Sequence, residues 1–243
     1  MAISIQNSDH LQKIHRKYLR RSILGFLGAL LCFSVFLLTM NLGKPALLYG
    51  SLGVLLLCMA LGGAMWKKAS IYAAGVRGEY TLLHILEALP DSWHLFSNVK
   101  LTWKDQTCEM DMVAVGPTGV FVIENKNQKG TVWASPESRN WNRQKNDRRD
   151  SFYSPVRQVK THIYVLANVL RSQGLGIYVE GAVFFSHPQA EVKGAEKFSD
   201  IPVFCLSAQG DKALLSHLKN RPKALPPAQL QKICNIMDGS QSR

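Results

Sequence analysis

Residues 109–127 read EMDMVAVGPTGVFVIENKN, and this stretch decides the fold. Two apolar, largely β-branched runs flank a turn made of Gly116-Pro117-Thr118-Gly119, which is typical of two antiparallel strands. We predict these strands at Cys108–Val115 and Val120–Lys126. If the turn is a four-residue loop with Gly119 in a left-handed conformation, Val115 faces Val120. Because both faces of the pair carry apolar side chains, both faces should be buried.

Charged side chains gather at one end of this strand pair. Side chains alternate along a strand, so the same register places Asp111 opposite Glu124, with Lys126 two residues further along on the same face. A three-residue loop would instead place Asp111 opposite Asn125. A structural ion pair of Lys126 with Glu109 or Glu124 is the simpler interpretation of these charges. Two carboxylates and a lysine at the end of a buried strand pair nevertheless mark a candidate functional site.

A helix and a strand precede the pair. The apolar residues of Glu79–Leu89 follow a helical period that ends at Pro90-Asp91, and His94–Trp103 is typical of a strand. Glu79 projects from the same helix face as the apolar stripe, which is an unusual place for a carboxylate. The alternative is a first-turn glutamate that the helix dipole favours and that bends toward water.

The segment from Gly130 to Tyr153 is polar and basic, with aromatic residues between the charges. Basic side chains that contact phosphates, together with aromatic rings that stack on bases, are typical of nucleic-acid binding. We predict a loop here, and a loop whose charges are simply solvated is the alternative to a binding surface. The candidate nucleic-acid-binding residues are Arg139, Arg143, Lys145, Arg148, Arg149 and Trp141.

Helices and strands alternate in the rest of the chain. Ser154-Pro155 has the form of a helix start, a capping residue followed by a first-turn proline, and Gln158 lies one turn into this helix. The helix should continue to Gly174. Further strands are predicted at Ile177–Ser186 and Ile201–Leu206, and closing helices at Leu214–Leu218 and Ala228–Met237. The scattered His162, His187 and His217 lack the spacing of metal ligands, and we interpret them as structural.

The front of the chain differs in charge from the remainder. The 243 residues carry 29 Lys plus Arg against 17 Asp plus Glu, a formal net charge of +12, yet residues 23–66 contain Lys44 as their single charged residue. Ile23–Met40 and Ala46–Trp66 are each apolar and long enough to cross most of a hydrocarbon core of ~30 Å. Basic residues flank both spans and largely avoid the turn-forming residues 41–45, so the positive-inside rule places both termini and the soluble domain in the cytoplasm, at the inner membrane.

A cleaved signal peptide fits the first span poorly, because a long polar leader precedes it and a second apolar span follows it. The last 177 residues are long enough for one core of ordinary size. The composition excludes a disordered acidic tail, a collagen-like repeat and a small disulfide scaffold. Five cysteines without C-x-x-C spacing indicate a reduced compartment, with a zinc site or a structural disulfide as the alternative.

Several motifs occur in an order that resembles the NERD (nuclease-related) domain of the PD-(D/E)xK nuclease superfamily. They are Gly75-x-x-Gly78-Glu79, the stretch 109–127, Gly130, Trp141 and Ser154-Pro155-x-x-Gln158, and the resemblance covers residues 73–185. It implies a restriction-endonuclease-like α/β/α core with a mixed central sheet, here preceded by two transmembrane helices. Met110 replaces the proline of the superfamily name, and polar Asn125 stands where an apolar residue or threonine is usual.

The resemblance also implies roles for the site residues. Asp111 and Glu124 would bind Mg²⁺ or Mn²⁺, and Glu79 would be a further ligand, directly or through water. Lys126 would hold or deprotonate the attacking water and offset phosphate charge, and Gln158 would orient that water or a phosphate.

We therefore expect a membrane-anchored, metal-dependent nuclease that hydrolyses phosphodiester bonds, of DNA rather than RNA. The expected domains are a basic cytoplasmic leader at 1–22, a transmembrane hairpin at 23–66 and a nuclease domain at 67–243. One alternative is a non-catalytic module of nuclease fold that binds nucleic acid or a partner at the membrane. A structural protein that binds anionic lipid is another alternative, but it leaves the buried acids unexplained. The sequence is also compatible with a homo-oligomer.

Overall fold

The structure, a computed structural model, describes residues 2–5, 9–40, 42, 44–221 and 225–241. These residues form two compact units. One unit comprises residues 9–76, and the other comprises residues 77–243 together with the described part of residues 1–8. Asn41 and Gly43, which belong to the predicted turn between the two apolar spans, lie outside the described residues.

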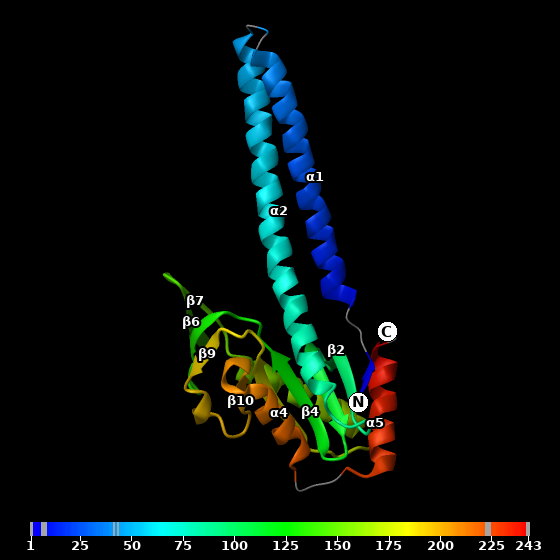
Figure 1. Ribbon diagram of the computed structural model, residues 1–243. Helices are drawn as coiled ribbons and strands as arrows, with labels where there is room; N and C mark the ends of the chain where they lie inside the picture. The colour runs from blue at the N-terminus through cyan, green and yellow to red at the C-terminus, as the bar shows by residue number, and fades with distance from the viewer. Residues whose placement is uncertain (1, 6–8, 41, 43, 222–224, 242–243) are drawn as a thin grey trace. The chain divides into compact units, whose positions relative to one another are not determined.

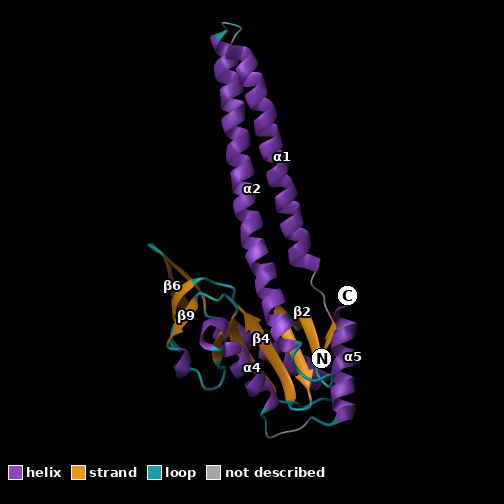
Figure 2. Ribbon diagram, in the orientation of Figure 1, coloured by secondary structure: helices purple, strands orange, loops and turns teal. Residues whose placement is uncertain are grey.

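Two long helices account for the first unit. Helix α1 spans Asp9–Met40, and helix α2 spans Pro45–Leu86 and so continues beyond this unit (Figures 1 and 2). Both helices are long and apolar enough to cross a membrane. Only 11% and 6% of their most apolar windows is buried inside the protein, whereas the core helix of a soluble protein is mostly buried. The composition that predicts two apolar spans therefore corresponds to two helices with exposed apolar side chains.

The two helices of this unit pack against each other in antiparallel fashion. Ser22 Oγ donates a hydrogen bond to the carbonyl oxygen of Gly62 (3.0 Å), and the hydroxyls of Thr39 and Ser51 lie 3.2 Å apart nearer the turn. Gly25 meets Gly62 so closely that a Cβ at position 25 would lie 2.8 Å from the Cα of Gly62. A residue without a side chain is therefore needed at this contact.

A mixed six-stranded sheet forms the centre of the second unit. Its strand order is β1-β2-β3-β4-β8-β10, with antiparallel pairing from β2 to β4 and parallel pairing of β1 with β2, β4 with β8 and β8 with β10. The strands are β1 (Ile3–Ile5), β2 (His94–Trp103), β3 (Gln106–Gly116), β4 (Gly119–Asn125), β8 (Val179–Phe185) and β10 (Val203–Cys205).

Helices cover both faces of this sheet. Helices α3 (Pro155–Ser172) and α5 (Pro227–Gln241) pack on the face that carries Val122. The last turns of α2 and helix α4 (Gly210–Lys219) pack on the face that carries Phe121. Because consecutive residues of a strand point to opposite faces, both faces of β4 are apolar and buried. The predicted α/β fold with a mixed sheet between helical layers is confirmed.

A second sheet corrects one prediction. The segment from Gly130 to Tyr153, predicted to be a loop, forms three of its four strands. The strand order is β7-β6-β5-β9, with β5 (Gly130–Trp133), β6 (Asn140–Lys145), β7 (Arg148–Tyr153) and β9 (Ala190–Lys193). The loop prediction is wrong. The sequence carries no sign of these strands because few side chains of the segment are apolar, and because β5 pairs with β9, which lies far along the chain.

Short helices and cysteines complete the second unit. Two 3₁₀ helices, η1 (Ala195–Lys197) and η2 (Leu206–Ala208), flank β10. All five cysteines are free, and Cys108, Cys205 and Cys234 are buried. These three thiols serve as small core side chains, as the sequence predicts.

Candidate functional site

The turn between β3 and β4 sets the register of the candidate site. Val115 pairs with Val120, so the predicted register is confirmed over that of the three-residue alternative. The turn itself is shorter than predicted, because Gly116 also pairs with Gly119 and only Pro117 and Thr118 connect the strands. Gly119 has a φ of +151°, a backbone conformation that favours glycine. The pairing runs as far as Met112 with Ile123, and one further step places Asp111 opposite Glu124.

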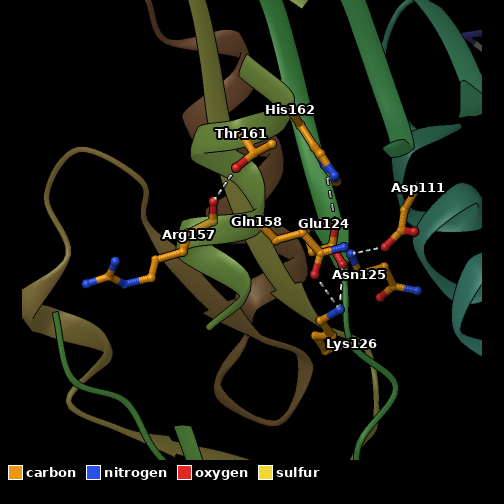
Figure 3. A network of polar contacts seen from close by, with 8 residues as sticks. All are labelled: Asp111, Glu124, Asn125, Lys126, Arg157, Gln158, Thr161 and His162. Atoms are coloured by element: carbon orange, nitrogen blue, oxygen red, sulfur yellow. Dashed lines mark hydrogen bonds and ion pairs between the residues drawn. The ribbon is translucent and has the colours of Figure 1, made fainter. Parts of the chain in front are cut away.

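Asp111 and Glu124 meet at the end of this ladder. The backbone N–H of Asn125 donates a hydrogen bond to Asp111 Oδ2 (2.7 Å), which holds the Asp111 carboxylate against β4 (Figure 3). Beyond the effect of burial, the negative charge of Asp111 raises the pKa of Glu124, so the two carboxyl groups interact electrostatically. Because like charges disfavour each other, the pair gains from a nearby proton or cation.

The interior of the sheet disfavours charge on both acids. The Glu124 side chain is 1% exposed. Burial raises the pKa of Glu124 to about 8, the Asp111 carboxylate adds to the rise, and Lys126 partly opposes it. Burial likewise raises the pKa of Asp111, against the opposing charge of Lys126. The two acids therefore form a site that gains from a nearby positive charge.

Lys126 supplies part of that charge. Its Nζ donates hydrogen bonds to Glu124 Oε1 (2.5 Å) and to Gln158 Oε1 (3.2 Å), as Figure 3 shows. The backbone N–H of Lys126 donates to the carbonyl oxygen of Phe184 (2.8 Å), which fixes the residue just beyond the end of β4. The structure thus brings Asp111, Glu124, Lys126 and Gln158 together.

The start of helix α3 presents Gln158 to this cluster. Ser154 caps the helix, its Oγ accepting a hydrogen bond from the backbone N–H of Arg157 (3.4 Å), and Pro155 is the first helical residue. This confirms the predicted helix start. With the helix starting at Pro155, Gln158 points toward Lys126 and Arg157 points away from it (Figure 3).

His162 is a member of the cluster that sequence reasoning missed. Its Nδ1 lies 3.6 Å from Glu124 Oε2, and burial, with a smaller contribution from Lys126, lowers its pKa to about 4. The imidazole is therefore neutral at physiological pH. The position of His162 in the sequence could have indicated this contact, because a residue four positions after Gln158 lies on the same face of the helix.

Glu79 lies on α2 beside the β2 strand. Its Oε2 accepts a hydrogen bond from Asn98 Nδ2 (3.5 Å). Burial raises the pKa of Glu79 to about 7, the bond from Asn98 opposes the rise, and the charges of Asp111 and Glu109 add to it. The charge of Asp111 thus reaches Glu79, but the hydrogen bond of the Glu79 carboxylate is to Asn98.

Gly78 allows α2 to approach the end of β4. A Cβ at this position would lie 2.6 Å from Asn127 Cβ, 2.9 Å from Asn125 Nδ2 and 3.0 Å from Ser186 Oγ. Any side chain at position 78 would therefore displace the segment that carries Asn125 and Lys126. The Gly78-Glu79 motif positions the helix as well as the carboxylate.

The residues of the acid pair fit a divalent cation. Mg²⁺ is usually bound by one or two carboxylates and keeps several waters. Glu124 Oε2 is buried without a hydrogen-bond partner, and burial raises the pKa of both acids against the opposing charge of Lys126. Within the described residues, no group of three or more His, Cys, Asp or Glu side chains is arranged to hold a metal. Of the two expected roles of Glu79, contact through a water molecule suits this arrangement better.

The basic residues of the second sheet have partners of their own. Arg143 pairs with Asp150 across the β6–β7 hairpin, and the Arg139 guanidinium lies 6.0 Å from the ring centroid of Tyr153. The side chains of Lys145, Arg148 and Arg149 are exposed. These residues lie on β6 and β7 and in the segment before β6.

The expected role of Trp141 is wrong. The side chain is 0% exposed, its ring stacks on Phe185 with centroids 6.5 Å apart, and its Nε1 donates to the carbonyl oxygen of Ser135 (3.2 Å). A tryptophan in this position belongs to the core between the two sheets and presents no face to a base.

Comparisons with known proteins agree with the geometry. Residues 74–186 match the family described as the nuclease-related domain, NERD. An uncharacterized protein of Bacillus anthracis is 30% identical over 101 residues, which are 41% of this chain and 48% of that protein. The chain thus spans about half the length of the curated relative it matches. No solved structure matches the chain. The resemblance to the nuclease-related domain that the motifs predict is confirmed over residues 74–186.

Proposed function

We propose that the nuclease-related domain at residues 74–186 hydrolyses phosphodiester bonds of nucleic acid, DNA rather than RNA, in a metal-dependent reaction. The observation that carries this proposal is the buried pair of Asp111 and Glu124, whose charge Lys126 balances only in part. A purely structural ion pair needs one carboxylate for one lysine. A second carboxylate beside the first adds the free energy of burying another negative charge, and a divalent cation would offset that free energy.

Each residue has a distinct role in the proposed reaction. Mg²⁺ or Mn²⁺, held by Asp111 and Glu124, would activate water and polarise the phosphate. The Lys126 ammonium, anchored by Glu124 and Gln158, would hold the attacking water and offset the charge that develops on the phosphate oxygens. Gln158 retains an amide N–H₂ that can donate to a phosphate oxygen. Neutral His162 packs beside Glu124 without adding a second positive charge.

We further propose that α1 and α2 anchor the domain in the inner membrane with both termini in the cytoplasm. The exposed apolar surface of the two helices supports membrane insertion, and the basic residues that flank them support this orientation. A cytoplasmic domain would have access to DNA and to Mg²⁺. An anchored nuclease would act on nucleic acid near the membrane surface.

The second candidate is a non-catalytic module of nuclease fold. It is favoured by the contact of Glu79 with Asn98, because the described residues then offer only two close carboxylates to a metal. Such a module would bind nucleic acid through the basic residues Arg139, Lys145, Arg148 and Arg149, without cutting it.

A cleavage assay on the full-length chain in detergent separates the two candidates. Wild type, Lys126→Ala and the control Lys129→Ala are incubated with supercoiled and single-stranded DNA and Mg²⁺ or Mn²⁺. Lys126→Ala should cut at least roughly 100-fold more slowly, because charge stabilisation in the transition state is lost. Its DNA affinity should change little, with the salt slope of binding lower by about one unit. Lys129→Ala should cut as wild type does.

Two outcomes contradict the proposed reaction. Equal cutting by wild type and Lys126→Ala would assign the activity to another site or to a contaminating nuclease. Binding of DNA by all three proteins without cutting by any of them would establish the non-catalytic module instead.

A further inference from the structure

The second sheet has one buried face and one exposed face. Val132, Trp141 and Phe152 point to the buried face, where they join the core beneath the sheet. The alternate residues point outward, and the strand register places Trp133, Asn142 and Ser151 in one row across β5, β6 and β7. The outward row that follows pairs Asn140 with Tyr153, and Lys193 of β9 stands beside Trp133. We call these outward residues, with Arg139 and with Arg149, which pairs with Gln144 in the next outward row, the outer face.

Two aromatic side chains lie open on the outer face. Trp133 is 40% exposed and Tyr153 is 43% exposed, on strands whose other aromatic residues are in the core. Both rings have a cation nearby: Lys193 Nζ is 5.9 Å from the ring centroid of Trp133, and the Arg139 guanidinium is 6.0 Å from that of Tyr153. Single exposed apolar residues are common, but two exposed aromatic rings on one face, each beside a cation, form a patch of the kind that marks a binding site.

A groove of about 660 Å³ opens beside Trp133. Its lining residues are Trp133, Asn142, Arg143, Arg149, Asp150 and Ser151. The Asn142 amide and the Ser151 hydroxyl can donate and accept hydrogen bonds, as the edges of bases require. The groove therefore combines an aromatic ring, neutral polar groups and basic side chains.

The charge of the outer face suits an anionic ligand. Arg143 and Asp150 pair with each other in the row of Val132, and Glu191 accepts a hydrogen bond from Thr131. Arg139, Arg149 and Lys193 remain as basic side chains around the two rings. The pKa of Asp150 is held low by the hydrogen bond from Arg143, so this pair stays ionised and internally neutral over the physiological range.

The spacing of the two rings suits two unpaired bases of one strand. Trp133 and Tyr153 are two strands and two residues apart, which corresponds to roughly 12 Å from the usual strand spacing and rise. A flexible single strand can place two of its bases on rings at this separation. In a duplex both faces of each base are covered by neighbouring pairs, so the rings would gain nothing from it.

We propose that the outer face binds single-stranded nucleic acid, with unpaired bases stacked on Trp133 and Tyr153 and phosphates held by Arg139, Arg149 and Lys193. The proposal rests on the proposed nuclease function, because it names the form of substrate that this domain receives. It assigns to Trp133 the stacking role that the sequence suggested for Trp141.

Binding to oligonucleotides tests the proposal without cleavage. The full-length chain in detergent is titrated, in EDTA, against fluorescein-labelled dT12 and against the same strand annealed to dA12. Trp133→Ala and Tyr153→Ala should each weaken dT12 binding roughly 10-fold and leave duplex binding within about twofold, since stacking is lost only for unpaired bases. Trp133→Phe should retain most of the affinity. Tyr178→Ala, which removes an aromatic side chain that is 78% exposed elsewhere on the domain, is the matched control and should bind as wild type does.

Three results would overturn the proposal: unchanged dT12 binding by Trp133→Ala and Tyr153→Ala, an equal loss for single strand and duplex, or a larger loss of binding to vesicles of anionic lipid than to dT12 in these two variants. Near-ultraviolet circular dichroism checks that the variants are folded. The outcome is independent of the Lys126→Ala assay. Loss of cleavage in Lys126→Ala, together with weaker dT12 binding by Trp133→Ala and Tyr153→Ala, would support both proposals. If Lys126→Ala cuts as wild type does, the proposed reaction is wrong, but the proposed binding of single strands to the outer face is unaffected.

Discussion

Replacement of Glu124 by glutamine should stabilise the metal-free protein at high pH. The Glu124 side chain is 1% exposed, and burial and the neighbouring Asp111 raise its pKa from 4.5 to about 8. Glutamine has nearly the same shape as a protonated glutamate but cannot ionise. The substitution therefore removes the ionisation and keeps the packing.

The sign and size of the effect follow from the shifted pKa. Below pH 4.5 Glu124 is protonated in both the folded and the unfolded chain and costs nothing. Between pH 4.5 and 8 the unfolded chain releases the proton and the folded protein keeps it, so the free energy of unfolding falls as pH rises. One pKa unit corresponds to 1.36 kcal/mol. Between pH 5 and pH 8 the variant should therefore gain about 3 to 4 kcal/mol relative to wild type.

Urea unfolding of the full-length chain in detergent and EDTA measures this difference. Tryptophan fluorescence reports the unfolding of the α/β unit at pH 5 and at pH 8. Because His162 and His217 have lowered pKa values and titrate in the opposite sense, the quantity to compare is the difference between variant and wild type at each pH. Glu109→Gln, an exposed acid on β3, is the matched control and should show no such pH-dependent gain.

Addition of Mg²⁺ extends the test to the metal. A ligand at 100 times its dissociation constant stabilises the folded state by about 2.7 kcal/mol. Wild type should gain stability on this scale at pH 8, and Glu124→Gln should gain much less. Parallel pH profiles for variant and wild type in EDTA would refute the reasoning, because they would show that Glu124 is ionised and held by Lys126 as a structural ion pair.

Three further predictions concern the glycine contact, the two tryptophans and the membrane helices. Gly78→Ala should lower the free energy of unfolding by about 1 to 3 kcal/mol, because its Cβ would lie 2.6 Å from Asn127 Cβ. Gly239→Ala, whose added Cβ would meet no atom within 4 Å, should not destabilise the protein, and equal effects of the two substitutions in urea titrations would contradict this. Trp141→Ala should lower the free energy of unfolding by about 3 to 5 kcal/mol, and Trp133→Ala should lower it by less than about 0.5 kcal/mol. A larger loss for Trp133→Ala than for Trp141→Ala would contradict the burial of Trp141. Reporters fused to the two termini should both be cytoplasmic, and a reporter inserted between α1 and α2 should lie on the other side of the membrane. An extracytoplasmic reporter at the C-terminus would contradict the proposed orientation.

Much of the acid pair could be predicted from local sequence. The Gly116–Gly119 turn determines the register of β3 and β4, because a tight turn leaves one pairing for the strands that it joins. Alternation along the strands then places Asp111, Glu124 and Lys126 on one face. The apolar composition of residues 23–66 likewise predicts the long exposed helices, and Ser154-Pro155 predicts the start of α3, because capping depends on a few neighbouring residues.

Only the tertiary structure decides the contacts between segments that are distant in the sequence. The loop expected at 130–153 is a set of strands because β5 pairs with β9, a segment whose sequence carries no sign of its partner. The same pairing buries Trp141 and leaves Trp133 open, although both lie among basic residues. His162 reaches Glu124, and Glu79 reaches Asn98, because helices cross the sheet at particular places. Turns and caps are encoded by adjacent residues, whereas burial is decided by the packing of the whole domain.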